Sequence, residues 1–150
     1  MKTLKLRWQR LVDAHGQTCN RCGATEQAVQ RAAADLRPAL HGLGIEVQLE
    51  TSVINPEDFS RAPLESNRLW IGDEPLEHWL GASAGESRCC STCGDASCRT
   101  LKLADATYEA IPVELIIKAG LLAAAQLLGH TPAGCCSQPE PAAGGGGCCG

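Results

Sequence analysis

The sequence has no apolar segment long enough to cross a bilayer. Its most apolar stretch, Val113 to Leu128, is interrupted by Glu114, Lys118 and Gln126. A transmembrane helix needs about 20 predominantly apolar residues in succession. We therefore expect a buried helix here, and no insertion into a membrane.

The sequence also lacks a block of basic residues. Its formal net charge is −4, with 13 Lys and Arg residues against 17 Asp and Glu residues. Nucleic acids and anionic membrane surfaces attract basic patches, so this balance argues against both as partners. Residues 1–10 alternate charged and apolar side chains and lack the continuous apolar core of a secretory signal. These absences predict a cytoplasmic protein.

Cysteine, by contrast, is abundant, with ten among 150 residues. A disulfide framework would spread its cysteines along the chain, whereas these occur in close groups. A bridge between adjacent cysteines closes a strained ring. In a reducing compartment, grouped cysteines more often bind metal ions or exchange disulfides. The ten residues are Cys19, Cys22, Cys89, Cys90, Cys93, Cys98, Cys135, Cys136, Cys148 and Cys149.

The composition changes sharply near the C-terminus. From Thr131 the chain reads TPAGCCSQPEPAAGGGGCCG, which is rich in Pro and Gly and offers little apolar surface to bury. We predict one folded domain over residues 1–129, followed by a disordered Gly/Pro/Cys tail over 130–150. A random coil of about 20 residues has an end-to-end distance of roughly 25 Å, enough to reach much of a small domain's surface.

The first half of the domain alternates between strand and helix patterns. Residues 4–9 and 45–50 alternate apolar and polar side chains, which predicts two strands. Apolar residues recur at helical spacing over 25–40, and we expect Pro38 to kink or break the last turn of this helix. A helix between two strands favours a right-handed parallel unit.

The second half predicts an antiparallel arrangement. Residues 68–71 and 99–103 have strand patterns, Gly72-Asp73 predicts a turn, and a helix begins at Pro112 and runs to Leu128. The resulting β-α-β-β-β-α order is the core of a thioredoxin-like α/β fold. In this interpretation the last two strands form an expanded hairpin, and residues 73–98 are a cysteine-rich insertion between them.

A Cys-x-x-Cys motif lies where the first strand passes into the first helix. Cys19 would stand at the helix N-terminus, where unpaired backbone N–H groups and the helix dipole favour a thiolate. Arg21 adds a positive charge nearby. A lower thiol pKa suits disulfide exchange, with Cys19 as nucleophile and Cys22 as resolving thiol, and it equally suits capture of a soft metal ion.

Several motifs occur in a fixed order along the chain: Trp8-Gln9-Arg10-Leu11, Gly16-x-Thr18-Cys19-x-Arg21-Cys22, Leu64-Glu65-Ser66-Asn67-Arg68, Pro75-Leu76-Glu77, Cys89-Cys90-x-x-Cys93-Gly94, Cys98-Arg99-Thr100 and Tyr108-Glu109-x-Ile111-Pro112. Together they resemble a prokaryotic family of unknown function whose members are thought to be thioredoxin-like. The resemblance spans nearly residues 1–128 and implies a fold rather than an activity. Ordinary thioredoxins place a cis-proline before strand three, beside the active site. This chain has Glu65-Ser66-Asn67 there, which argues against routine disulfide reductase work.

The tail resembles a second family. A thioredoxin-like domain that ends in vicinal cysteine pairs is similar to the arsenic metallochaperones that hand trivalent arsenic to an efflux pump. Cys135-Cys136 and Cys148-Cys149 carry this likeness, with a longer spacer here. Vicinal thiols on a mobile arm can also take up and exchange soft ions without a rigid cage. The alternative is that a Gly-rich tail merely tolerates cysteine.

The middle group, Cys89, Cys90, Cys93 and Cys98, offers enough thiolates for a tetrahedral zinc site or an iron–sulfur cluster. A structural zinc or disulfide knot and a transferable metal site both fit this spacing. In a thioredoxin-like sheet the hairpin between strands three and four points away from the Cys-x-x-Cys end, and the last helix finishes on that far side. We therefore expect the tail to emerge nearer this group than to Cys19.

These patterns lead to three hypotheses. The first is thiolate-based binding and handover or buffering of arsenic(III), mercury(II), copper(I) or zinc by the ten cysteines, with a metal efflux or detoxification protein as a partner. The second is a thiol-disulfide oxidoreductase that uses Cys19 and Cys22. The third is a zinc-stabilised interaction module. No organic cofactor is evident from the sequence.

Overall fold

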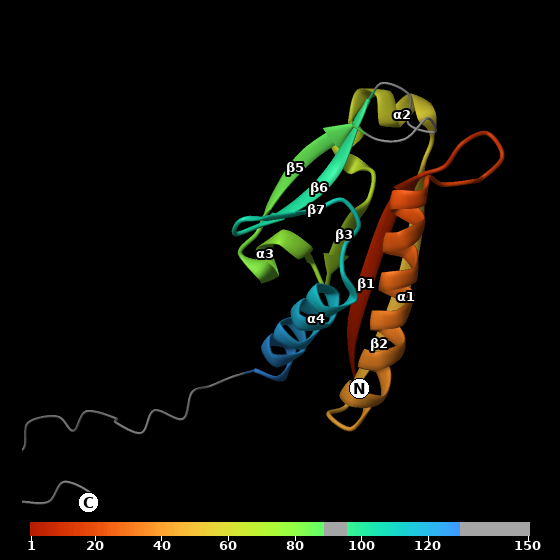
Figure 1. Cartoon of the computed structure of the whole chain (residues 1–150). Coiled ribbons are helices and arrows are strands. Elements are labelled where there is room, and N and C mark those ends of the chain that lie inside the picture. The colour runs from red at the N-terminus through yellow and green to blue at the C-terminus, as the bar shows by residue number, and fades with distance from the viewer. Residues whose placement is uncertain (89–95, 130–150) are drawn as a thin grey trace, which may run out of the picture.

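The computed structural model describes residues 1–88 and 96–129 (Figure 1). Within these residues the fold is mixed α/β, with a four-stranded and a three-stranded sheet. Its elements, in chain order, are β1 (Lys2–Leu11), α1 (Asn20–His41), β2 (Ile45–Ile54), α2 (Pro56–Arg61), the short 3-10 helix η1 (Pro63–Glu65), β3 (Arg68–Ile71), β4 (Glu74–Pro75), α3 (Leu76–Leu80), β5 (Ser83–Arg88), β6 (Ser97–Leu103), β7 (Ala106–Tyr108) and α4 (Val113–Leu128).

The larger sheet has the strand order β2-β1-β3-β4. The predicted parallel pair is confirmed, since β1 runs parallel to β2 from Lys2 opposite Ile45 to Leu11 opposite Ile54. On its other side β1 pairs antiparallel with β3, and Leu6 lies opposite Ile71. The central strand β1 therefore ends directly before the loop that leads to the Cys-x-x-Cys motif.

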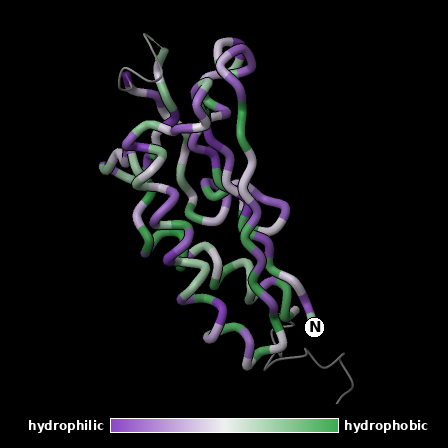
Figure 2. The backbone as a smooth tube through the Cα atoms, turned by 90° about the vertical axis from the view of Figure 1, so that its right-hand side faces the viewer, coloured by the Kyte–Doolittle hydropathy of each residue, from purple (hydrophilic) through white to green (hydrophobic). Residues whose placement is uncertain are grey.

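One face of β1 forms the centre of the core. Leu4, Leu6 and Trp8 are fully or almost fully buried, while Lys5 and Arg7 on the opposite face are exposed. Helices α1 and α4 pack against each other and contact β1 (Figure 1). Hydrophobic and hydrophilic residues alternate along the helices and strands, as Figure 2 shows, which is the pattern of elements with one buried face.

The predicted hairpin between residues 68–71 and 99–103 was wrong. Instead β3 turns at Gly72, where φ is 63°, and pairs at once with the two-residue strand β4, with Trp70 opposite Pro75. Strand β6 belongs to the second sheet, where it pairs antiparallel with β5 and β7. The tight turn closes a short hairpin locally, and the predicted insertion holds β4, α3 and β5. The strand β5, with the sequence SAGESR, has too few apolar residues to be recognised by periodicity.

The first helix also differs from the prediction. It begins at Asn20, as the position of the Cys-x-x-Cys motif predicted, although the apolar helical spacing starts only at residue 25. It continues through Pro38 to His41, so Pro38 does not break the helix. Leu36 and Leu40 lie on either side of Pro38 and are each 1 % exposed. Their burial stabilises the last turns although proline removes one helical hydrogen bond. The last helix, α4, follows the prediction to within one residue at its start. None of the helices in the described part of the chain is long and apolar enough to span a bilayer.

Candidate dithiol site

Cys19 is the N-cap residue of helix α1, as predicted. A loop closed by Asp13 leads from β1 to this position; the Asp13 carboxylate accepts hydrogen bonds from the backbone N–H groups of Gln17 and His15. These bonds, that of Gln17 above all, lower the pKa of Asp13. Thr18 then donates its hydroxyl proton to the carbonyl oxygen of Leu11 at 2.9 Å. The loop thus places Cys19 at the start of α1, close to the end of the central strand β1.

The two cysteines of the motif are in direct contact and have unequal environments. The backbone N–H of Cys22 donates to Cys19 Sγ at 3.5 Å, so Cys19 receives the stabilisation that an N-cap position offers a thiolate. Cys19 is 4 % exposed, whereas Cys22 is completely buried. Both carry thiols rather than a disulfide.

The pKa of Cys22 is raised far above its ordinary value. The largest cause is the hydrogen bond between its thiol and the Cys19 sulfur, followed by burial and by the negative charge on Cys19. The Ser66 hydroxyl and, less strongly, the neighbouring Thr18 hydroxyl act in the opposite direction and lower the pKa of Cys22. Cys19 therefore loses its proton before Cys22, and the Cys22 thiol is directed at the Cys19 sulfur.

The segment before β3 closes the site from the other side. Ser66 Oγ lies 3.7 Å from Cys22 Sγ and also accepts a hydrogen bond from the backbone N–H of Leu11. Asn67 has a φ of 56°, in the left-handed region, and its side chain accepts from Trp8 Nε1 and donates to the carbonyl oxygen of Glu109. Asn67 is one of the few residue types that adopt this conformation readily. Of the three residues Glu65-Ser66-Asn67, Ser66 is the one whose side chain contacts the cysteine pair.

Arg21 makes contacts that the sequence did not indicate. Its guanidinium donates to Ser87 Oγ and to the carbonyl oxygen of Arg88, each at 3.0 Å, and forms an ion pair with Glu109 at 3.0 Å. The Arg21 guanidinium group thus contacts both the end of β5 and the segment before α4. The end of β5 consequently lies beside the first turn of α1.

The middle cysteine group was predicted far from the Cys-x-x-Cys end, and this was wrong for its described member Cys98 and for Arg88 beside it. Arg88, which directly precedes this group, contacts Arg21 at the Cys-x-x-Cys end of the domain. Cys98 is completely buried in β6, opposite Ser87. The other three members, Cys89, Cys90 and Cys93, lie outside the described residues.

The tail leaves the domain from the opposite end. The Lys2 ammonium group, at the start of β1, donates to the carbonyl oxygen of Leu127, so α4 does finish on the far side from Cys19. The middle group was expected on that far side as well, whereas Arg88 and Cys98 lie toward the Cys19 end, so the reason for expecting the tail nearer to this group than to Cys19 does not hold. The predicted tail ligands Cys135, Cys136, Cys148 and Cys149 are outside the described residues.

The described part of the chain contains no grouping of three or more His, Cys, Asp or Glu side chains that could hold a metal ion. Among the predicted ligands, the structure brings together Cys19 and Cys22. Zinc prefers four ligands in a structural site. Zinc held by this pair would therefore need further ligands from residues 89–95 or 130–150.

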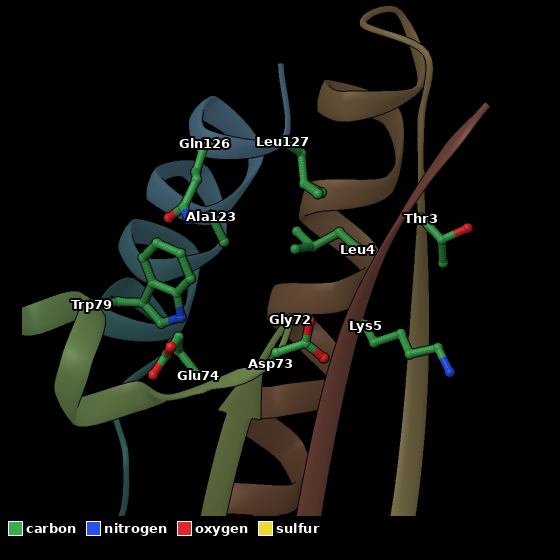
Figure 3. Close-up of a pocket in the computed structure, with 10 residues that line it drawn as sticks. All are labelled: Thr3, Leu4, Lys5, Gly72, Asp73, Glu74, Trp79, Ala123, Gln126 and Leu127. Atoms are coloured by element: carbon green, nitrogen blue, oxygen red, sulfur yellow. The ribbon is translucent and has the colours of Figure 1, made fainter. Parts of the chain in front are cut away.

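A separate pocket lies near the start of β1, where α4 finishes (Figure 3). Its volume is about 610 Å³. Leu4 and Leu127 supply apolar surface, Trp79 forms a wall and donates its indole N–H to the carbonyl oxygen of Ile71, and Asp73 and Glu74 are exposed at the edge. Sequence reasoning missed this pocket because its residues come from segments far apart in the chain.

The fold and the site together define a mixed α/β domain with a Cys-x-x-Cys pair at the start of its first helix. The chain belongs to the family described as "Domain of unknown function (DUF2703)", whose pattern matches residues 4–120. It is 38 % identical over 113 residues to an "Uncharacterized protein" of the archaeon Archaeoglobus fulgidus, an alignment that covers 75 % of this chain and 82 % of that protein. No solved structure matches the chain significantly. The predicted membership of a family of unknown function is confirmed.

Proposed function

We propose that this protein exchanges disulfides, with Cys19 as the attacking thiolate and Cys22 as the resolving thiol. The observation that carries this proposal is the asymmetry of the pair. Cys19 accepts a backbone hydrogen bond at a helix N-terminus, whereas Cys22 is completely buried and its pKa is raised. A stabilised thiolate beside a protonated thiol is the division of roles that a two-step exchange requires.

In the first step the Cys19 thiolate attacks one sulfur of a substrate disulfide. A bond forms between Cys19 and that sulfur, and the other substrate sulfur leaves as a thiolate that takes up a proton from solvent. In the second step Cys22 loses its proton to solvent and attacks Cys19 Sγ. The substrate sulfur leaves and is protonated, so the substrate is reduced to two thiols and the protein is oxidised to a Cys19–Cys22 disulfide.

The causes that raise the pKa of Cys22 make the second step depend on the first. Two of the three, the hydrogen bond to Cys19 and the charge on Cys19, require a Cys19 thiolate. A mixed disulfide at Cys19 carries no charge, so both causes disappear and the pKa of Cys22 falls. The Cys22 thiol thus keeps its proton before substrate reacts. It becomes easier to ionise, and so reactive, once Cys19 has formed the mixed disulfide.

The topology supports a thioredoxin-like fold for this exchange. The strand order β2-β1-β3-β4, with the motif following the central parallel strand and a helix after the β3–β4 hairpin, fits such an arrangement. We propose narrower substrate use than in ordinary thioredoxins, because Ser66-Asn67 takes the place of their proline. Cysteines that occur in close groups rather than in a spread framework are typical of a reducing compartment, and we propose a cytoplasmic location.

The decisive test is to trap the intermediate. Full-length Cys22→Ser is incubated with glutathione disulfide, and mixed disulfides are located by peptide mass spectrometry. We expect glutathione to accumulate on Cys19 in this variant and a Cys19–Cys22 disulfide to form in the wild type. Cys19→Ser is the matched control and should carry no glutathione on Cys22. Equal glutathione on both positions, or on neither, would contradict the assigned roles.

A second candidate function is the binding of a soft ion by the same pair. Two adjacent thiols with no third ligand grouped around them in the described residues favour ions that accept two sulfur ligands, such as mercury(II) or copper(I). Arsenic(III) or zinc would call on cysteines outside the described residues, including the tail pairs, and handover would require an efflux or detoxification protein. The zinc-stabilised module would also need cysteines outside the described residues.

Native mass spectrometry distinguishes these ions. The full chain, a chain ending at His130 and a Cys19→Ser/Cys22→Ser double variant are each titrated with mercury(II), copper(I), arsenic(III) and zinc. We expect the chain ending at His130 to retain one mercury(II) or copper(I) ion that the double variant loses. Binding no tighter than that of a simple dithiol would contradict the ion-binding function and leave disulfide exchange untouched.

A further inference from the structure

We infer that Ser66 is the positioning residue that orients the Cys22 sulfur for the resolving step. This inference rests on the proposed disulfide exchange and adds to it a residue outside the Cys-x-x-Cys motif. Ser66 precedes β3 and is 44 positions from Cys22 in sequence, yet its hydroxyl oxygen lies 3.7 Å from Cys22 Sγ. Both residues are completely buried.

The direction of the hydrogen bond follows from the partners of Ser66. A hydroxyl group has one proton to donate and can accept up to two. Ser66 Oγ already accepts the N–H of Leu11 at 3.1 Å. In the described residues, Cys22 Sγ is the group near the Ser66 hydroxyl that can accept its proton. A buried hydroxyl that donates to nothing is costly, so Ser66 donates to Cys22.

The position of Ser66 is itself held from both sides. Before it, the carbonyl oxygen of Glu65 accepts a hydrogen bond from Gln9 Nε2 at 2.9 Å. After it, the Asn67 side chain accepts from Trp8 Nε1 at 3.3 Å and donates to the carbonyl oxygen of Glu109 at 3.2 Å. Two of these anchors are on β1, the strand that also supplies the Leu11 N–H. Contacts with β1 therefore fix the position of the Ser66 hydroxyl group. That hydroxyl group in turn orients the Cys22 sulfur.

This chain of contacts bears on one chemical step. When Cys19 is joined to a substrate sulfur, Cys22 Sγ must face Cys19 Sγ to form the new bond and displace the substrate. A hydrogen bond from Ser66 restricts the rotation of the Cys22 side chain, and it continues to stabilise the sulfur while negative charge develops there. The first attack, by Cys19, does not use this contact. Ser66 should thus affect resolution and leave the first step unchanged.

The test measures the two steps separately in the full-length protein. Wild type, Ser66→Ala and Ser66→Thr react with glutathione disulfide, samples are quenched with acid at intervals, and peptide mass spectrometry quantifies glutathione on Cys19 and the Cys19–Cys22 disulfide. Ser60→Ala, which removes a hydroxyl from the exposed helix α2, is the matched control. Thermal unfolding of each variant shows that it is folded.

In Ser66→Ala we expect conversion of the mixed disulfide to the Cys19–Cys22 disulfide to slow by about tenfold, the effect of a lost hydrogen bond to a group that becomes charged. The rate at which Cys19 first reacts should stay within about twofold of the wild type. Ser66→Thr keeps the hydroxyl and should resolve faster than Ser66→Ala, and Ser60→Ala should behave as wild type. Because Ser66→Thr is compared directly with wild type, it also tests the inference if Ser66→Ala does not fold.

Three results would overturn the inference alone. The first two are unchanged resolution in Ser66→Ala, and a Ser66→Thr variant that folds but resolves at one tenth of the wild-type rate or less. Equal slowing of both steps would also overturn it, since that would indicate a structural role. A wild-type protein that never forms the Cys19–Cys22 disulfide would instead overturn the proposed disulfide exchange itself.

Discussion

The guanidinium of Arg21 donates a hydrogen bond to the carbonyl oxygen of Arg88, a residue 67 positions further along the chain. The Arg21 side chain is 9 % exposed and also forms an ion pair with Glu109. One residue from within the Cys-x-x-Cys motif therefore joins the first turn of α1, the end of β5 and the segment before α4. The dithiol and Arg88, the last described residue before the middle cysteine group, are held at the same end of the domain by this contact.

Replacing Arg21 should destabilise the packing of α1 against the end of β5 and the segment before α4. We expect Arg21→Ala to lower the free energy of unfolding by about 2 kcal/mol, since it removes hydrogen bonds to a charged, largely buried group. Arg21→Lys should recover only part of this, because an ammonium group cannot reproduce the planar fork of a guanidinium. Urea unfolding under reducing conditions measures both.

The matched control for Arg21 is Arg31→Ala. Arg31 also lies on α1 and pairs with Asp35, but it is exposed. The loss of this exposed ion pair should lower the free energy of unfolding much less than Arg21→Ala does. An equal decrease in the free energy of unfolding for Arg21→Ala and Arg31→Ala would show that the Arg21 contacts do not stabilise the packing of these elements.

The buried Cys22 thiol predicts a loss of stability in alkaline solution. Its pKa is raised in the folded protein above the ordinary value of 9.0, so above about pH 9 the unfolded chain releases a proton that the folded chain retains. Stability from this group is complete below pH 9 and should then fall by up to about 1.4 kcal/mol per pH unit. Chemical denaturation between pH 7 and pH 10 tests this, with a reductant present. The decline should be shallower in Cys22→Ala, and an identical decline would exclude Cys22 as its source.

Two non-glycine residues with positive φ should respond to substitution in opposite ways. Asn67, at φ 56°, makes hydrogen bonds with Trp8 and Glu109, so Asn67→Ala should destabilise the protein by about 2 kcal/mol. Ala104, at φ 51°, is exposed, and Ala104→Gly should stabilise it by up to about 1 kcal/mol by relieving the left-handed conformation. Thermal unfolding midpoints measure both. A destabilised Ala104→Gly variant would contradict the argument from backbone strain.

The contact between α1 and α4 depends on the absence of a side chain at Gly120. A Cβ atom there would lie 2.6 Å from Leu36 Cδ1, so Gly120→Ala forces Leu36 to move and should cost about 1 to 3 kcal/mol. Combining it with Leu36→Ala should cost less than the sum of the single changes, because the smaller residue makes room. Gln126→Ala, exposed on the same helix, is the control. Strict additivity in urea unfolding would contradict the direct contact.

Elements with strong periodicity were predictable, and those without it were not. The parallel strands β1 and β2 and the helices α1 and α4 have regular apolar spacing that arises from their own neighbours in sequence. The strand β5 is polar along its length and was missed, and without it β6 was assigned to β3. Pairing between strands depends on which distant segments meet, and a strand pattern alone does not specify its partner.

The sequence by itself determined that Cys19 and Cys22 stand at the start of a helix after the first strand, because strand alternation, helix spacing and capping are local properties of the chain. The tertiary structure alone decided what surrounds them. Ser66 contacts Cys22 across 44 positions, and Arg21 contacts Arg88 across 67. Such contacts follow from how β1, β3 and β5 are placed in two sheets, since burying one continuous core brings these distant segments together.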